Sequence, residues 1–198
     1  MSISVVIAYH SGYGHTARQA QAVASGAASV PGVTATLHNI AVPDEPLWQA
    51  LAEAEAIIFG TPTYMGSQSA VFQAFAEASG PVWAQQGWRD KIAAGFTTSA
   101  GVNGDKLNTL SSLAVFAAQH GMHWVSLGLP PGWLYTSDGD VEDLNRLGGF
   151  LGAMAQAPSD AGPDDAPAPA DLRTAEHLGR RVARVAVELS HGRLAGAA

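Results

Sequence analysis

The sequence predicts a single α/β domain of three layers, in which a five-stranded parallel sheet of order 2-1-3-4-5 carries helices on both faces. Short runs of β-branched and apolar residues alternate with longer segments whose apolar residues recur at helical spacing. The chain of 198 residues suits one domain, 1–198, and its length allows a large core without disulfides. Alternating strands and helices imply right-handed crossovers and hence parallel strands. The strand order is taken by analogy with doubly wound folds.

Five strands are expected from the buried β-like runs. The first four cover residues 3–9, 33–37, 55–60 and 91–98. The fifth begins at residues 123–127, is interrupted by a Gly- and Pro-rich segment, and resumes at residues 150–155. The carboxyl ends of parallel strands meet at one edge of the sheet, which is where such folds bind their ligands.

Four helices are expected at about residues 15–29, 67–79, 105–120 and 171–190. Each carries apolar residues at the spacing of one helical face. Gly80-Pro81 is expected to stop the second helix. The segment 157–170 is rich in Pro, Asp and Ala, and we expect a mobile loop before the last helix instead of a domain boundary.

The loop after the first strand has the features of a phosphate-binding site. It comprises Ser11, Gly12, Tyr13, Gly14, His15 and Thr16. The glycines allow the backbone to turn N–H groups inward, two hydroxyls are available, and the following helix adds the positive end of its dipole. The loop lacks a P-loop lysine and the GxGxxG spacing, so it suits a monophosphate held without metal. The alternative is a turn that only joins strand to helix.

Two further loops leave the carboxyl ends of strands three and four. The second includes Pro62, Thr63, Tyr64, Met65 and Gly66. Its Tyr-Met pair predicts a surface for a flat aromatic ring, and packing on the next helix is the alternative. The third includes Thr98, Ser99, Ala100, Gly101, Val102 and Gly104. Its small residues permit close backbone approach, so that its amides can bind the polar edge of a ring; the alternative is a flexible loop capped by Asp105.

Charge and composition narrow the function classes. The net charge of −7 disfavours a nucleic-acid partner, and the arginines within residues 173–184 are interpreted as the solvated face of the last helix. The chain has no cysteine, which removes thiolate metal ligands and cysteine nucleophiles, and we expect no metal. No apolar run is long enough to cross a bilayer and no basic stretch precedes one, so a cytoplasmic protein without a membrane partner is expected.

Five motifs in order along the chain carry a family resemblance: "YHSGYGHT", "IIFGTPTYMGS", "GPVW", "FTTSAG" and "QHGMHWVSLG". Together they resemble the flavodoxin-like NAD(P)H:quinone oxidoreductases of the tryptophan-repressor-binding-protein type, from the first strand to the last helix. The resemblance implies a flavodoxin-like fold that binds FMN, with NADH or NADPH as electron donor and quinones as acceptors. It also implies a homo-oligomer, either a homodimer or a homotetramer.

The same resemblance implies roles for individual residues. Residues 11–16 would hold the FMN phosphate, residues 63–65 would contact the isoalloxazine ring, and residues 99–104 would line its pyrimidine side. His120 stands where the family has a flavin-contacting histidine, although a helix-end histidine without a ligand is the alternative. Trp83 stands where the family has a tryptophan near nicotinamide and quinone, and Tyr13 would lie beside the entering nucleotide. Trp83, Trp88 and Trp133 are expected at a subunit boundary, with burial under the loops of a monomer as the alternative.

Three functions follow from these observations. The first is an FMN-dependent enzyme that transfers two electrons from NAD(P)H to a quinone by a ping-pong mechanism, because one open ring face serves both substrates. The second is a flavodoxin-type one-electron carrier. The third is a flavin-free binding or regulatory protein, although a receiver-like domain would need clustered acids after the first strand, where Tyr9-His10-Ser11 provides none.

Overall fold

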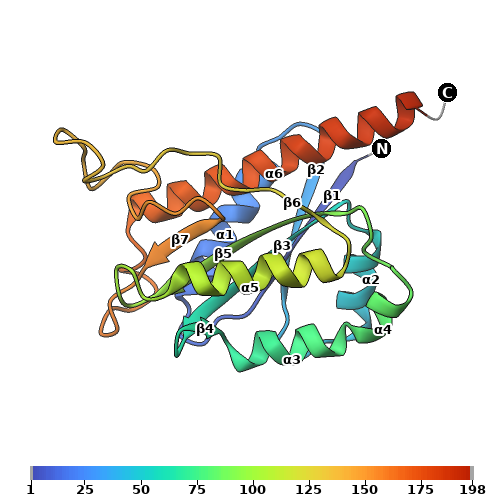
Figure 1. Cartoon of the computed structure of the whole chain (residues 1–198), viewed down its shortest axis with the longest axis horizontal. Helices are drawn as coiled ribbons and strands as arrows, with labels where there is room; N and C mark the ends of the chain where they lie inside the picture. Colours follow the sequence, from blue (N-terminus) through green and yellow to red (C-terminus); the bar gives the residue numbers. More distant parts are fainter. Residues whose placement is uncertain (1, 197–198) are drawn as a thin grey trace.

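A computed structural model describes residues 2–196 of the chain, with the side chains of residues 2–192. Its central sheet has the order β2-β1-β3-β5-β6 (Figure 1). The strands on this path are β1 (Ile3–Tyr9), β2 (Val33–Asn39), β3 (Ala56–Tyr64), β5 (Ile92–Ser99) and β6 (His123–Trp124). All neighbours on the path are parallel. The short strand β4 (Ser67–Gln68) pairs antiparallel with β3 and lies outside this path. When β4 is left out of the numbering, β5 and β6 are the fourth and fifth strands, and the order confirms the predicted 2-1-3-4-5 arrangement.

The fifth strand is split, as its interrupted sequence predicts. β6 pairs with the first two residues of β5, and β7 (Ala153–Gln156) pairs with residues 96–99 at the other end of the same strand. The irregular segment between them is held close to the sheet, where the Trp124 indole donates to the carbonyl of Leu151 at 2.9 Å. The carboxyl end of β5 is therefore flanked by β7, which positions the last loop of the chain beside it.

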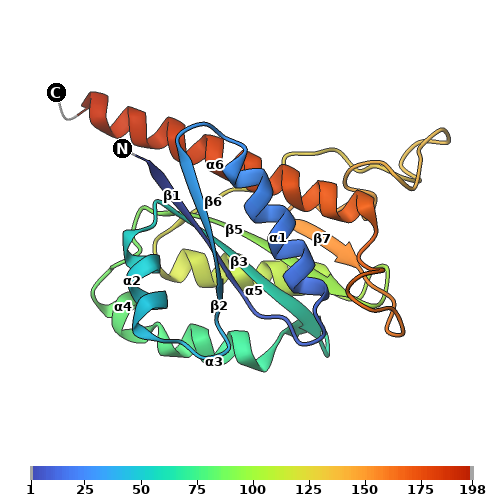
Figure 2. The same cartoon turned by 180° about the vertical axis from the view of Figure 1, so that it is seen from behind.

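Helices cover both faces of the sheet and enclose two apolar cores (Figure 2). On one face, α1 (His15–Ala28) packs against α6 (Pro169–Gly196) through buried residues such as Val23 and Val182. The other core lies beneath α2 (Glu45–Glu53), α3 (Ala70–Ala78) and α5 (Lys106–Gln119). Its centre is an aromatic cluster of Phe59, Phe72, Phe75, Trp88 and Phe116. Within the described residues no helix is long and apolar enough to cross a bilayer.

Two short helices, α2 and α4, were not anticipated, and the expected end of β3 needs correction. Helix α2 was not anticipated, although Asp44 caps it by accepting the Leu47 N–H at 3.0 Å and Leu47 and Leu51 are buried one turn apart. The β3 strand continues through Pro62 to Tyr64, so half of the expected second loop is strand. Helix α3 ends at Ala78, with Ser79 as its C-cap, just before Gly80-Pro81 as predicted; the short helix α4 (Gly80–Ala84), with the proline in its first turn, follows at once and was not anticipated.

The three tryptophans expected at a boundary have different environments. Trp88 is 1% exposed and belongs to the aromatic core, so its assignment to a subunit boundary was wrong. Its large ring fills the space between the sheet and the helices, which a loop-like sequence context did not reveal. Trp83 on α4 is 54% exposed, and Trp133 is half-buried in the irregular segment.

Candidate functional site

The three predicted loops meet at the carboxyl ends of β1, β3 and β5, around a cavity of about 530 Å³ that we call the first cavity. It is lined by Tyr13, His15 and Thr16, by residues 62–64 and 98–100, and by residues 157–159 and 161–163. This size is ordinary for a site that encloses a small organic ligand. The location matches the rule that open α/β sheets bind ligands beyond the carboxyl ends of their strands.

The first loop is built as an anion cradle. Gly14 caps α1 with a left-handed backbone, φ 91°, which a glycine adopts without strain. The Ser11 hydroxyl accepts the N–H groups of Gly14 and Ala17 at 3.1 Å each. Among the described residues, the N–H groups of His15 and Thr16 have no protein partner, as expected in a first helical turn. Free amides, a hydroxyl and a helix dipole together fit a phosphate monoester.

Two close approaches explain the glycines of this loop. A Cβ on Gly14 would lie 2.8 Å from the Pro163 side chain, and a Cβ on Gly12 would overlap the Tyr64 hydroxyl. Tyr64 in turn packs edge-on against Tyr13, with ring centroids 6.2 Å apart. Burial, with the neighbouring Tyr13 as a smaller cause, raises the pKa of Tyr64, so its hydroxyl stays protonated. The two tyrosines form an aromatic wall at the mouth of the first cavity.

Met65 takes no part in that wall. Its side chain is fully exposed, its backbone is left-handed at φ 49°, and it does not line the first cavity. The predicted aromatic surface is therefore Tyr13 with Tyr64, in place of Tyr64 with Met65. Gly66 also lies outside the lining, in the turn that follows β3.

A buried network of hydroxyls holds the strand ends in place. The Thr63 hydroxyl is 2.8 Å from those of both Thr97 and Thr109, and Thr97 donates to the carbonyl of Thr61 at 2.7 Å. Beside it, Thr98 donates to the Gln19 side chain at 2.7 Å. These bonds join β3, β5, α1 and α5, so the floor of the first cavity is fixed before any ligand enters. Gln19 and Thr109 could not be recognised from the sequence, because each joins the network through contacts between distant parts of the chain.

His10 and Ser69 join the same floor at its edge. Their Nδ1 and hydroxyl oxygen are 2.8 Å apart, and Ser69 also caps α3 by accepting the Phe72 N–H. Burial lowers the pKa of His10, so the ring is neutral at pH 7. Among the described residues, the lining of the first cavity offers polar side chains and main-chain amides to a ligand and contains no carboxylate.

The loop 157–170 closes one side of the first cavity. His15 Nε2 donates to the carbonyl of Ala161 at 2.9 Å, and Ala157, Ala166 and Ala170 are buried. The Pro-, Asp- and Ala-rich composition gave no indication of these buried anchors. Mobility itself stays a prediction. The contact between Pro163 and Gly14 shows that the loop and the anion cradle fit each other.

The third loop is fixed by two side chains that the sequence reasoning missed. Lys106, at the start of α5, donates through Nζ to the carbonyls of Gly101, Val102 and Asn103. Gln156 on β7 donates to the carbonyl of Ala100 at 2.8 Å. Ser99 and Ala100 line the first cavity, while Gly101, Val102 and Gly104 lie farther along the loop.

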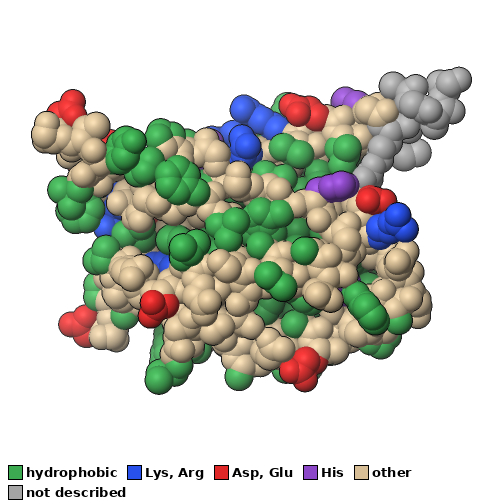
Figure 3. Space-filling view, viewed as in Figure 1, with side chains coloured by type: hydrophobic (Ala, Val, Ile, Leu, Met, Phe, Trp, Pro, Cys, Tyr) green, Lys and Arg blue, Asp and Glu red, His purple; other side chains and the backbone are tan. Residues whose placement is uncertain are grey.

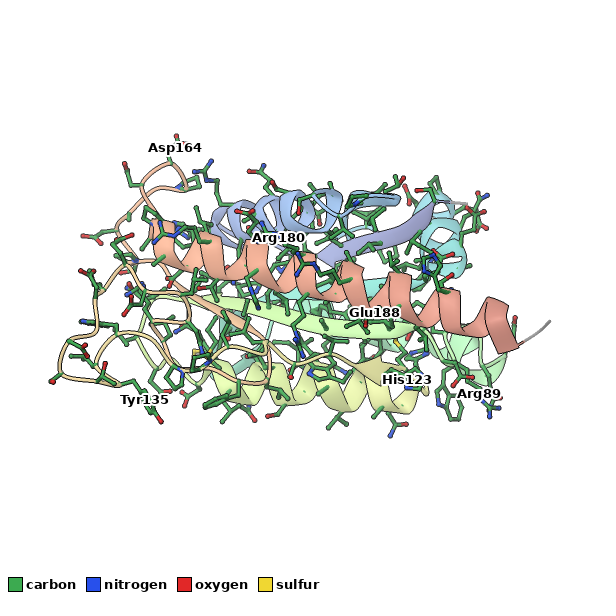
Figure 4. All side chains as sticks on the ribbon, turned by 90° about the horizontal axis from the view of Figure 1, so that it is seen from above. Arg89, His123, Tyr135, Asp164, Arg180 and Glu188 are labelled. Atoms are coloured by element: carbon green, nitrogen blue, oxygen red, sulfur yellow. The ribbon has the colours of Figure 1, made fainter. Side chains whose placement is uncertain are left out.

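His120 and Trp83 line a second cavity of about 430 Å³, together with Arg89. Arg89 and Asp164, a residue of the loop beside the first cavity, lie at opposite ends of the molecule (Figure 4). His120 ends α5, where Nε2 is 2.9 Å from the Ser79 hydroxyl and the ring lies 4.3 Å from Trp88. Burial lowers its pKa, and its Nδ1 has no partner among the described residues. Within one chain, His120 and Trp83 therefore do not line the first cavity, and their contact with a flavin stays a prediction.

The geometry agrees with comparisons to known proteins. Residues 1–129 match the model of the NADPH-dependent FMN reductase family. The chain belongs to this family. It is 44% identical over 189 residues to the protein named flavodoxin FldP of Pseudomonas aeruginosa, a match that covers 96% of this chain and 99% of the relative. It is also 31% identical over 210 residues to a protein of Geotalea uraniireducens named NAD(P)H dehydrogenase (quinone), covering 95% of this chain and all of the relative.

Solved structures lead to the same family. The crystal structure of a flavodoxin, WrbA-like protein from Agrobacterium tumefaciens superposes with a TM-score of 0.74 at 45% identity. The match covers 94% of this chain and 99% of the other. A flavodoxin from the domain Archaea, at 18% identity and a TM-score of 0.63, shows the fold alone. This member of the FMN reductase family thus has the predicted flavodoxin-like architecture.

Proposed function

We propose that this chain binds FMN in the first cavity and uses it to reduce quinones with electrons from NADH or NADPH. The observation that carries the proposal is the anion cradle at Gly14, which opens into the first cavity beside the Tyr13–Tyr64 wall. A phosphate group, an aromatic ring system and a polar ring edge each find a matching surface there. The relatives named NAD(P)H dehydrogenase (quinone) support the choice of substrates.

Bound FMN would supply the electron transfer itself, which no protein side chain provides. The residues of the chain would bind and orient it. Residues 11–16 hold the phosphate through amides and hydroxyls, Tyr13 and Tyr64 contact the ring, and the third loop offers its amides to the pyrimidine edge. No residue is required to act as a general acid or base. With FMN held in this way, nicotinamide and quinone would use the same open side of the site in turn, which would give a two-electron transfer in ping-pong order.

A second copy of the chain would bring the second cavity into the site. Trp83 and His120 are the family-matched residues that one chain leaves far from the first cavity, and a neighbouring subunit can supply them. The face that carries α5 and the irregular segment exposes hydrophobic side chains suited to such a contact (Figure 3). They include Leu107, Val115 and Phe150. We propose a homodimer or homotetramer, and a monomeric mass by light scattering at micromolar concentration, with full activity, would refute it.

The competing function is a one-electron carrier of the flavodoxin type, which the name of the Pseudomonas aeruginosa relative favours. Three measurements test the proposal against this alternative. The visible spectrum of the purified protein shows whether flavin is bound, and steady-state oxidation of NADH and NADPH with benzoquinone shows turnover. Anaerobic titration then counts electrons: a two-electron enzyme reaches the fully reduced spectrum in one transition, whereas a carrier shows a separate transition at half reduction. Colourless protein that binds no added FMN would overturn the proposal.

A further inference from the structure

Every carbonyl of the third loop from Ala100 to Asn103 accepts a hydrogen bond from a side chain. Lys106 Nζ lies 2.6, 3.0 and 3.1 Å from the carbonyl oxygens of Gly101, Val102 and Asn103. Gln156 Nε2 lies 2.8 Å from that of Ala100. An ammonium group has three donors, and here all three are used. Lys106 is fully buried, which is rare for a lysine without such partners.

This arrangement fixes which groups of the loop stay available. With four consecutive carbonyls turned toward Lys106 and Gln156, the N–H groups lie on the other side of the peptide planes. In the part of the chain that the structure describes, no N–H group of residues 100–104 donates to a protein atom. Ser99 and Ala100 already line the first cavity. The loop is therefore held in a conformation that offers amides to a ligand.

The charges around Lys106 belong to one buried cluster. Asp171 at the start of α6 and Arg146 form a bidentate pair at 2.7 and 2.8 Å, and both act on Lys106 electrostatically. Asp171 also accepts the backbone N–H of Gln156 at 2.8 Å, so the same cluster places the second side chain that holds the loop. Burial lowers the pKa of Lys106 to about 8, with Asp171 raising it and Arg146 lowering it.

We propose that Lys106 is a positioning residue for bound FMN: it fixes the third loop with its amides toward the polar edge of the ring and sets a positive charge behind them. The inference rests on the proposed function. A reduced flavin is the more negative form, so amides and a buried ammonium close to it favour that form over the oxidised one. A merely structural lysine would stabilise the fold without distinguishing the two forms.

The chain contains one other lysine, which makes a matched control. Lys91 also donates through Nζ to backbone carbonyls, those of Ala52 and Ala54, but immediately before β5, at the opposite end of that strand from the third loop. Lys106→Met and Lys91→Met each remove one ammonium group that binds carbonyls. The affinity of each variant for FMN is measured by titrating apoprotein with FMN and recording the quenching of the FMN fluorescence. The midpoint potential of bound FMN gives the preference for the reduced form.

We expect Lys106→Met to bind FMN about tenfold more weakly or worse, and Lys91→Met to stay within about twofold of the parent. If Lys106→Met also loses a tenfold preference for reduced FMN, its potential falls by about 30 mV, the value for a two-electron couple. In the parent, FMN affinity should fall as the pH rises through about 8, because the protonated lysine supplies the third donor and the charge. Lys106→Met should lack that pH dependence.

Each other outcome has a definite reading. Equal losses of affinity in the two variants, or an unchanged potential in Lys106→Met, would overturn the positioning role while leaving FMN binding intact. Failure of the parent to bind FMN would overturn the proposed function instead. If Lys106→Met does not fold, the parent alone decides, because an FMN affinity that is constant between pH 7 and 9 contradicts the inference.

Discussion

Replacing Trp83 by alanine tests whether the second cavity belongs to the catalytic site. The Trp83 ring is 54% exposed on the short helix α4, beside Arg89 and His120. If it forms one wall of the pocket for nicotinamide and quinone in an oligomer, its removal takes away a ring contact worth roughly 0.5–1.5 kcal/mol. The apparent KM for quinone or NAD(P)H should then rise about two- to tenfold. Bound FMN should be retained, since Trp83 does not line the first cavity, into which the anion cradle opens.

The cost to stability should be small. Full burial of an aromatic side chain contributes roughly 1.5–3 kcal/mol to the free energy of unfolding. Because the Trp83 side chain is only about half buried, we expect Trp83→Ala to lower the free energy of unfolding by about 1 kcal/mol. Trp88→Ala is the matched control, because that ring lies in the adjoining core at 1% exposure. Its removal should cost roughly 3–5 kcal/mol, with normal kinetics in the protein that remains folded.

Thermal unfolding and steady-state kinetics on both variants, at concentrations where the oligomer is intact, separate these roles. A folded, flavin-loaded Trp83→Ala protein with the parent's KM and kcat would remove Trp83 from the site. A loss of stability in Trp83→Ala as large as that of Trp88→Ala would show that the ring is part of the core.

Three further changes address the first cavity. Ser11→Ala should weaken FMN binding by about 1–3 kcal/mol and lower stability by about 1 kcal/mol, because the hydroxyl also caps α1; calorimetric titration and melting measure the two. Gly14→Val should abolish flavin retention, because a β-branched residue cannot adopt φ 91° and its Cβ meets Pro163, and a variant purified with full flavin content would refute the cradle. Deleting residues 159–163 should weaken FMN binding while lowering the melting temperature only slightly, because most of these residues line the cavity whereas the buried anchors Ala157, Ala166 and Ala170 remain. Hydrogen exchange over residues 157–170 in the parent measures the mobility of this loop.

Much of the sheet could be predicted from the sequence because buried parallel strands are continuous apolar runs. The bounds of β1 match the expected residues 3–9, and even the split of the fifth strand was visible in its interrupting glycines and prolines. Helix α2 was missed because it has only nine residues and buries only two of them, Leu47 and Leu51, which is too short a pattern to show helical periodicity. The extension of β3 was missed because Pro62 reads as a strand end, yet it sits in register with Thr98.

Some residues of the candidate site could be recognised from the sequence and others could not. The first loop could be recognised because its glycines, hydroxyls and helix start are contiguous in the sequence. Gln19 and Gln156 could not, because Gln19 bonds to a residue 79 positions away and Gln156 to one 56 positions away. Lys106 was missed for another reason: a lysine in a first helical turn is normally solvated, and only the loop folding back over it buries the ammonium. His120 and Trp83 stand at positions that the family motifs predict for the site, but within a single chain they line the second cavity and not the first.

The unusual burial of Lys106 also predicts how stability depends on pH without any ligand. Its pKa is lowered from 10.5 to about 8 in the folded chain, so between those values the unfolded chain binds more protons. Unfolding free energy must then rise with pH over this window, by at most about 1.4 kcal/mol per pH unit and about 3 kcal/mol in all. Lys106→Met lacks this contribution, while every other titrating group is common to both proteins and cancels in the difference.

Denaturation of the two apoproteins between pH 7 and 10 measures that difference directly. We expect the parent to gain stability relative to Lys106→Met as the pH rises above about 8, in the same range where its FMN affinity falls. These opposite signs follow from one cause, because the buried ammonium is costly to the empty fold and useful to the bound cofactor. A stability difference that stays constant from pH 7 to 10 would mean that Lys106 keeps the pKa of a solvated lysine, and the loop would then have to be held by something other than a strained buried charge.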